Sequence, residues 1–101
     1  MDNLKKETLA LQKYIPKSKK DLPTFLTLLY ATELLVHFDW MKEMAQEDIT
    51  RTDFNALDDA LLLRKLLTAH VRADRFNEGH LIEFCLSGKM SSLLNRLAAV
   101  L

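Results

Sequence analysis

The spacing of apolar residues constrains the fold of this chain more than any other feature of its sequence. Apolar side chains recur every three or four positions through most of the 101 residues, the period of an amphipathic α-helix, and strand-like alternation is almost absent. Only two glycines and two prolines interrupt the pattern. We therefore predict an all-α fold, a compact bundle of five or six helices. It is a single domain over 1–101, with a basic first helix and linker in 1–20 and the core in 21–101.

Breaks and capping residues set the bounds of the expected helices, which are 3–15, 21–36, a short helix from 39, 56–76, 78–86 and 89–100. The helix over 21–36 is apolar around nearly its whole circumference, so we expect it in the middle of the fold. The polar stretch 47–55 is expected to be a loop. Asn77 is the expected cap of the fifth helix, and Gly88 is the expected glycine after its end.

The formal net charge is zero, but the charges are segregated along the chain. Residues 1–20 carry six lysines against two acids, 21–60 carry nine acids against two bases, and 61–101 carry six bases against three acids. Global neutrality argues against a nucleic-acid partner. The acidic block is a candidate docking face for a protein, formed by Glu43, Glu47, Asp48, Asp53, Asp58 and Asp59. The plainer alternative is a solvated face that balances the lysines of the first helix.

The cellular compartment is indicated by cysteine usage and by the lack of long apolar runs. Cys85 is the single cysteine, so an internal disulfide is excluded and a reducing cytoplasm is expected. The lysine-rich start is unlike a signal peptide, and no apolar run is long enough to span a membrane. We expect a cytoplasmic protein without membrane association.

The stretch 64–80, RKLLTAHVRADRFNEGH, is the segment that could carry chemistry. Arg64, Thr68, Arg72 and Arg75 form a polar stripe on an otherwise apolar helix. On the opposite, apolar side lie His70 and Asp74 at i,i+4 spacing, and this pair is expected inside or at the lip of the core. A buried carboxylate needs donors, which the imidazole, Arg75 or the amides of the next helix could supply.

Two functional interpretations of this stretch stand beside structural ones. The candidate cluster for an anion, a ligand or a structural charge network is His70, Arg72, Asp74, Arg75, Glu78 and His80. Arginines around a helix N-terminus could bind an anion, or Asp74 or Glu78 could already occupy those amides. A His70–Asp74 couple could act as a base, or His70 could be a satisfied core histidine.

No catalytic residue, metal site or cofactor is expected from the sequence. The chain has no convincing nucleophile elbow and no glycine-rich phosphate loop. His37, Glu78 and His80 do not have a recognised metal-ligand spacing.

Two elements of the sequence, Phe-Asp-Trp at Phe38–Trp40 and LTAHVRADRFNEGHL at Leu67–Leu81, resemble a family of small bacterial and phage domains of unknown function. The resemblance extends through 28–41 and 61–97 and leaves the first twenty residues outside. It implies a bacterial or bacteriophage source and a stand-alone domain, and it brings no activity.

Three functions are consistent with these observations. The first is a small cytoplasmic, non-enzymatic helical interaction module that binds a protein partner. The second is a small enzyme or an anion- or ligand-binding domain with its site at the Arg72–His80 junction. The third is a phage-type inhibitor, such as an anti-CRISPR protein, that uses the acidic surface. A homo-oligomer formed through the C-terminal helix stays open, because that helix ends with Leu97, Val100 and Leu101.

Overall fold

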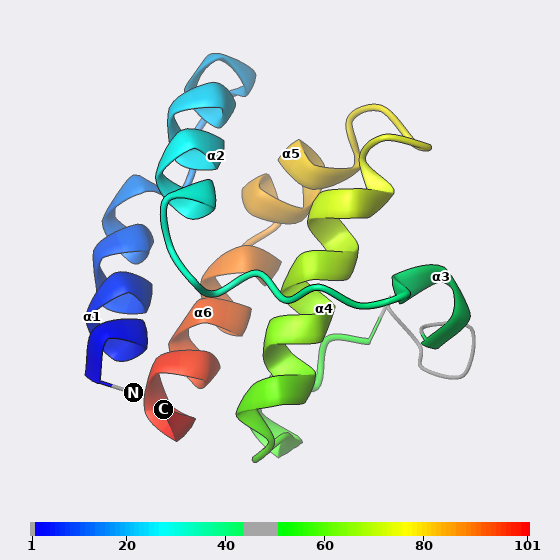
Figure 1. Ribbon diagram of the computed structural model, residues 1–101. Coiled ribbons are helices and arrows are strands. Elements are labelled where there is room, and N and C mark those ends of the chain that lie inside the picture. The colour runs from blue at the N-terminus through cyan, green and yellow to red at the C-terminus, as the bar shows by residue number, and fades with distance from the viewer. Residues whose placement is uncertain (1, 44–50) are drawn as a thin grey trace.

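The computed structural model describes residues 2–43 and 51–101 and confirms the all-α prediction (Figure 1). Within these residues there is no strand. The α-helices are α1 (Asp2–Leu11), α2 (Leu22–Tyr30), α3 (Trp40–Glu43), α4 (Ala60–Ala73), α5 (His80–Leu86) and α6 (Lys89–Val100). Three short 3-10 helices connect them, η1 (Gln12–Tyr14), η2 (Lys19–Asp21) and η3 (Phe54–Ala56).

The last helix, α6, lies at the centre of the packing. It contacts α1, α4, α5 and η3, so segments from both ends of the chain lie side by side (Figure 1). Its apolar face is fully buried at Met90, Leu93, Leu94 and Leu97. Val100 and Leu101 also pack against the core, so the chain itself covers the apolar end of this helix.

The second helix is shorter than predicted, and its expected place in the middle of the fold was wrong. It ends at Tyr30 and buries only Phe25 and Leu29. The Thr32 hydroxyl donates to the Leu29 carbonyl at 2.6 Å and accepts from the Leu34 amide at 3.2 Å. A threonine hydroxyl that bonds the backbone in this way offers an alternative to the helical ladder.

Residues 32–39, the crossing segment, leave α2 and run across α6 and α4 to α3 (Figure 1). The polar stripe of α4 holds this segment: the Arg64 Nε donates to the Leu34 carbonyl at 3.0 Å, and the Thr68 hydroxyl accepts from the Val36 amide at 3.0 Å. The Lys65 ammonium lies 5.5 Å from the centroid of the Phe38 ring, within cation–π range. Two of the four residues of the stripe, Arg64 and Thr68, therefore hold the crossing segment in place.

Other helix bounds differ from the prediction for local reasons. Helix α4 starts at Ala60 because the Asp59 carboxylate caps it, accepting from the Leu61 amide at 2.9 Å. The residue before α5 is Gly79, with φ of 91°, and not the expected Asn77. Gly88, with φ of 87°, follows α5 as predicted, and α6 has the predicted bounds. Part of the expected loop 47–55 is helical, because Phe54 begins η3 and is buried.

Candidate functional site

The turn between α4 and α5, residues 74–79, brings His80 back onto α4. The Asn77 amide donates to the Ala73 carbonyl at 3.0 Å, and the His80 amide donates to the Asn77 carbonyl at 3.0 Å. The left-handed φ of Gly79 then reverses the chain into α5, a conformation that favours glycine. These bonds fix where the first side chain of α5 points.

Asp74 closes this turn by accepting a hydrogen bond from the Leu81 amide at 3.1 Å. This is part of the structural alternative to the anion site, in which a carboxylate of the chain occupies an amide at the start of α5 and also pairs with the arginines; among the described residues, no ion pair joins Asp74 to Arg72 or Arg75. Asp74 is therefore a positioning residue for α5.

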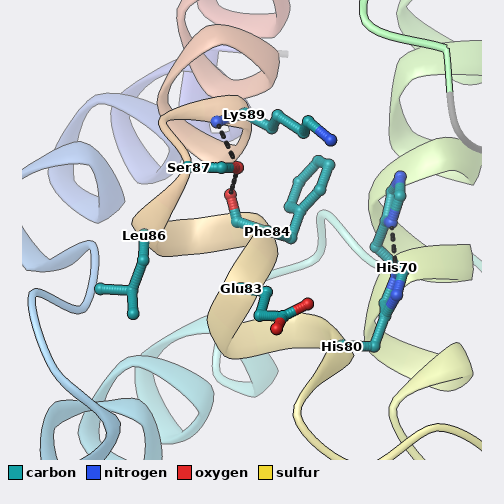
Figure 2. A pocket seen from close by; sticks show the side chains of 7 residues that line it. All are labelled: His70, His80, Glu83, Phe84, Leu86, Ser87 and Lys89. Carbon is teal, nitrogen blue, oxygen red and sulfur yellow. Dashed lines mark hydrogen bonds between the residues drawn. The ribbon is translucent and has the colours of Figure 1, made fainter.

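The structure pairs His70 with His80 and not with Asp74. Nδ1 of His70 lies 2.9 Å from Nε2 of His80 (Figure 2). The ring planes are 7° from parallel and the centroids are 5.1 Å apart, so the rings meet at their edges. One ring donates an N–H and the other accepts with a lone pair, so the bond holds a single proton between the two nitrogens.

Aromatic packing fixes His70 inside the core. His70 is 3% exposed, as the apolar side of α4 predicted. The ring of Phe84 lies against it, with centroids 3.9 Å apart and planes 21° from parallel. Phe84 in turn meets Phe54 edge to face at 6.4 Å. The buried imidazole is thus held by the ring of Phe84 on α5, which Phe54 of η3 supports in turn, and its partner His80 lies on the outer side.

A cavity of about 510 Å³ opens beside the histidine pair (Figure 2). Its lining comes from α4, from α5 and from the start of α6, and consists of His70, His80, Glu83, Phe84, Leu86, Ser87 and Lys89. Three of these, His80, Glu83 and Phe84, lie on one face of α5 at positions i, i+3 and i+4, and Ser87 continues that face directly after the helix ends. The Ser87 hydroxyl is committed to the chain, because it donates to the Phe84 carbonyl at 3.0 Å.

The predicted cluster is brought together only in part. His70 and His80 line the cavity, and Asp74 positions the start of α5, where His80 lies. Arg72, Arg75 and Glu78 do not line the cavity. Within residues 2–43 and 51–101, none of these three side chains forms an ion pair or a side-chain hydrogen bond.

The other lining residues of the cavity were not predicted from the sequence; they are Glu83, Phe84, Leu86, Ser87 and Lys89. A signal was present, because Glu83, Phe84 and Ser87 share the helical face of His80. What the sequence could not show is that this face meets His70.

The acidic face is described at three of its six positions. Asp53 pairs with Arg51 at 2.7 Å, and this hydrogen bond holds the pKa of Asp53 below its usual value. Asp58 accepts from Arg96, and Asp59 caps α4. The Glu43 side chain and the whole of Glu47 and Asp48 lie outside the described residues. The docking face stays a prediction.

Cys85 lies next to this site but faces the core. It is 5% exposed, and burial raises the pKa of its thiol to about 12. A protonated thiol is a poor nucleophile and a poor metal ligand. Elsewhere in the described part of the chain, no three His, Cys, Asp or Glu side chains gather into a group that could hold a metal ion. None of the described helices is long and apolar enough to cross a membrane.

Comparison with known proteins identifies a family, but the function of that family is unknown. The sequence matches a family of unknown function, DUF6508, over residues 2–101. The match includes residues 2–20, which lie outside the resemblance seen in the sequence. No curated protein and no solved structure matches the chain.

Proposed function

Because the chain belongs to DUF6508, a family of unknown function, we propose its function from the site alone: the protein binds a small molecule in the cavity beside His70 and His80. The observation that carries this proposal is the hydrogen-bonded imidazole pair on the wall of a cavity of about 510 Å³. Ligand cavities typically measure about 300–1,000 Å³ and combine an apolar lining with a few convergent polar groups.

The pair is suited to recognise a ligand because its members differ in exposure. His70 is buried and fixed by Phe84, whereas His80 is only half-buried. One nitrogen of His80 is used by His70, and its Nδ1 has no partner in the part of the chain that the structure describes. An imidazole nitrogen donates or accepts according to its tautomer, so it can serve either kind of ligand group.

We propose binding and not covalent catalysis at this site. The hydroxyl and the thiol nearby are committed, because the Ser87 hydroxyl donates to a backbone carbonyl and burial raises the pKa of the Cys85 thiol. Of the functions that the sequence left open, this proposal corresponds to a ligand-binding domain and not to a small enzyme.

The test is an amide chemical-shift screen of the whole chain with single-ring probes, namely benzamide, benzylamine, benzoate and phenol. We expect saturable shifts at residues that line the cavity, and we expect His80→Ala to weaken them. His37→Ala is the matched control, because His37 is an exposed histidine outside the cavity. Shifts that lie elsewhere, or that His80→Ala leaves unchanged, would overturn the proposal.

Three finer expectations accompany this proposal: a cytoplasmic location, a bacterial or phage source, and a protein partner. The buried thiol supports a reducing compartment. The protein partner, including an inhibitory one reached through the acidic face, stays a prediction. It is tested by capture of proteins from the native host with an Asp58→Lys variant as the comparison.

A further inference from the structure

Two opposite charges stand at the edge of the cavity. Glu83 on α5 and Lys89 at the start of α6 both line it, and both are exposed. Neither forms an ion pair or a side-chain hydrogen bond with any other residue in 2–43 or 51–101. The acid and the base are therefore both available to a ligand.

A ligand with a single charge is attracted by one of these groups and repelled by the other. A ligand that carries both charges satisfies both groups at once, which gives selectivity by complementary potential. The wall of the same cavity also includes three flat rings, those of His70 and Phe84, which are buried, and that of His80, which is half-buried. Such a wall suits a flat apolar body that can meet the rings by their faces or edges.

Resting on the small-molecule function proposed above, we propose that the ligand is a zwitterion of the aromatic amino acid class. Its ammonium group pairs with Glu83, its carboxylate pairs with Lys89, and its ring lies against Phe84 and His80. Nδ1 of His80 forms a hydrogen bond with the polar end of the ligand. The size of the cavity, about 510 Å³, accommodates such a molecule.

The experiment compares three probes that share one ring: L-phenylalanine, 2-phenylethylamine and 3-phenylpropionate. Dissociation constants are measured by amide chemical-shift titration of the full chain. Because an exposed ion pair contributes modestly, we expect L-phenylalanine to bind about two- to fivefold more tightly than either singly charged probe.

Two charge variants sharpen the test. Glu83→Gln is expected to make the dissociation constants of L-phenylalanine and 3-phenylpropionate equal. Lys89→Gln is expected to make those of L-phenylalanine and 2-phenylethylamine equal. The controls are Glu78→Gln and Lys20→Gln, which change exposed charges outside the cavity and are expected to leave all three constants unchanged. Circular dichroism confirms the fold of each variant.

The outcomes separate the ligand class from the site itself. Equal binding of the three probes that responds to His80→Ala but not to the charge variants overturns the zwitterion and leaves the proposed function standing. Tighter binding of one singly charged probe also overturns the zwitterion. Absence of binding by all three probes, together with no response to the single-ring panel, overturns both proposals.

Discussion

Nδ1 of His70 lies 2.9 Å from Nε2 of His80, and this bond ties α4 to α5 beside the cavity. His70 is buried and its ring is fixed by Phe84, so the position of His80 decides whether the bond forms. The turn 74–79 supplies that position through the Asp74 carboxylate and the conformation of Gly79. The stability of the bundle and the shape of the site therefore depend on the same few residues.

Removal of the outer histidine is expected to destabilise the fold. His80→Ala leaves Nδ1 of the buried His70 without this hydrogen bond, which costs about 1–3 kcal/mol of unfolding free energy. Urea unfolding followed by circular dichroism measures the loss. The exposed His37→Ala should stay within about 0.5 kcal/mol of the wild type. Equal stability of His80→Ala and wild type would show that the bond contributes nothing.

The anchor of the crossing segment is tested by Thr68→Val. The substitution keeps the shape of the side chain but removes the acceptor of the Val36 amide, and we expect a loss of about 1–2 kcal/mol. Thr27→Val is the matched control, because Thr27 is exposed and its hydroxyl donates only to the Pro23 carbonyl of its own helix. A similar small effect for both variants would contradict the anchoring role.

The conformation of Gly79 gives a third expectation. A Cβ at this position would meet nothing within 4 Å, so any loss comes from the backbone and not from a clash. With φ of 91°, Gly79→Ala should cost about 1–2 kcal/mol. Gly79→Asn should cost less, since asparagine tolerates positive φ better. Thermal unfolding ranks the variants, and a more stable alanine variant would contradict the expectation.

The buried thiol predicts a loss of stability in alkali. The pKa of Cys85 rises from its usual 9.0 to about 12 on folding, so the unfolded state loses its proton first. The stabilisation is complete below pH 9.0 and is lost as the pH rises towards about 12. Between pH 8 and pH 10, wild type should lose about 1 kcal/mol more than Cys85→Ala. Parallel pH profiles of the two proteins would show that burial does not perturb this thiol.

Much of the fold follows from local pattern. The bounds of α6 agree with the prediction, and this is the segment where the apolar pattern is strongest, with Met90, Leu93, Leu94 and Leu97 on one stripe. The end of α2 was missed because it depends on distant residues. The run from Leu34 to Val36 is as apolar as the helix before it, but the Thr32 hydroxyl bonds the Leu34 amide, and bonds to Arg64 and Thr68 on α4 hold the run outside the helix.

At the site too, the sequence predicts the features that depend on local pattern and not those that depend on distant contacts. The apolar side of α4 placed His70 inside, and the need for donors named the amides of α5 as one of three partners of Asp74, the one that the structure shows. The contact between His70 and His80 could not be foreseen, because it requires the reversal at Gly79. Without that geometry, the sequence does not show that the face shared by Glu83, Phe84 and Ser87 meets α4 at His70.

Helix α6, on which α1, α4 and α5 pack, is also the last of these helices to leave the ribosome. Until residues 89–100 emerge, the apolar faces of the earlier helices have only one another to cover them. Nascent chains stalled before Lys89 should therefore be sensitive to proteases and bound by chaperones, because incomplete chains expose apolar surface. The native core therefore forms only after residues 1–88 have been translated.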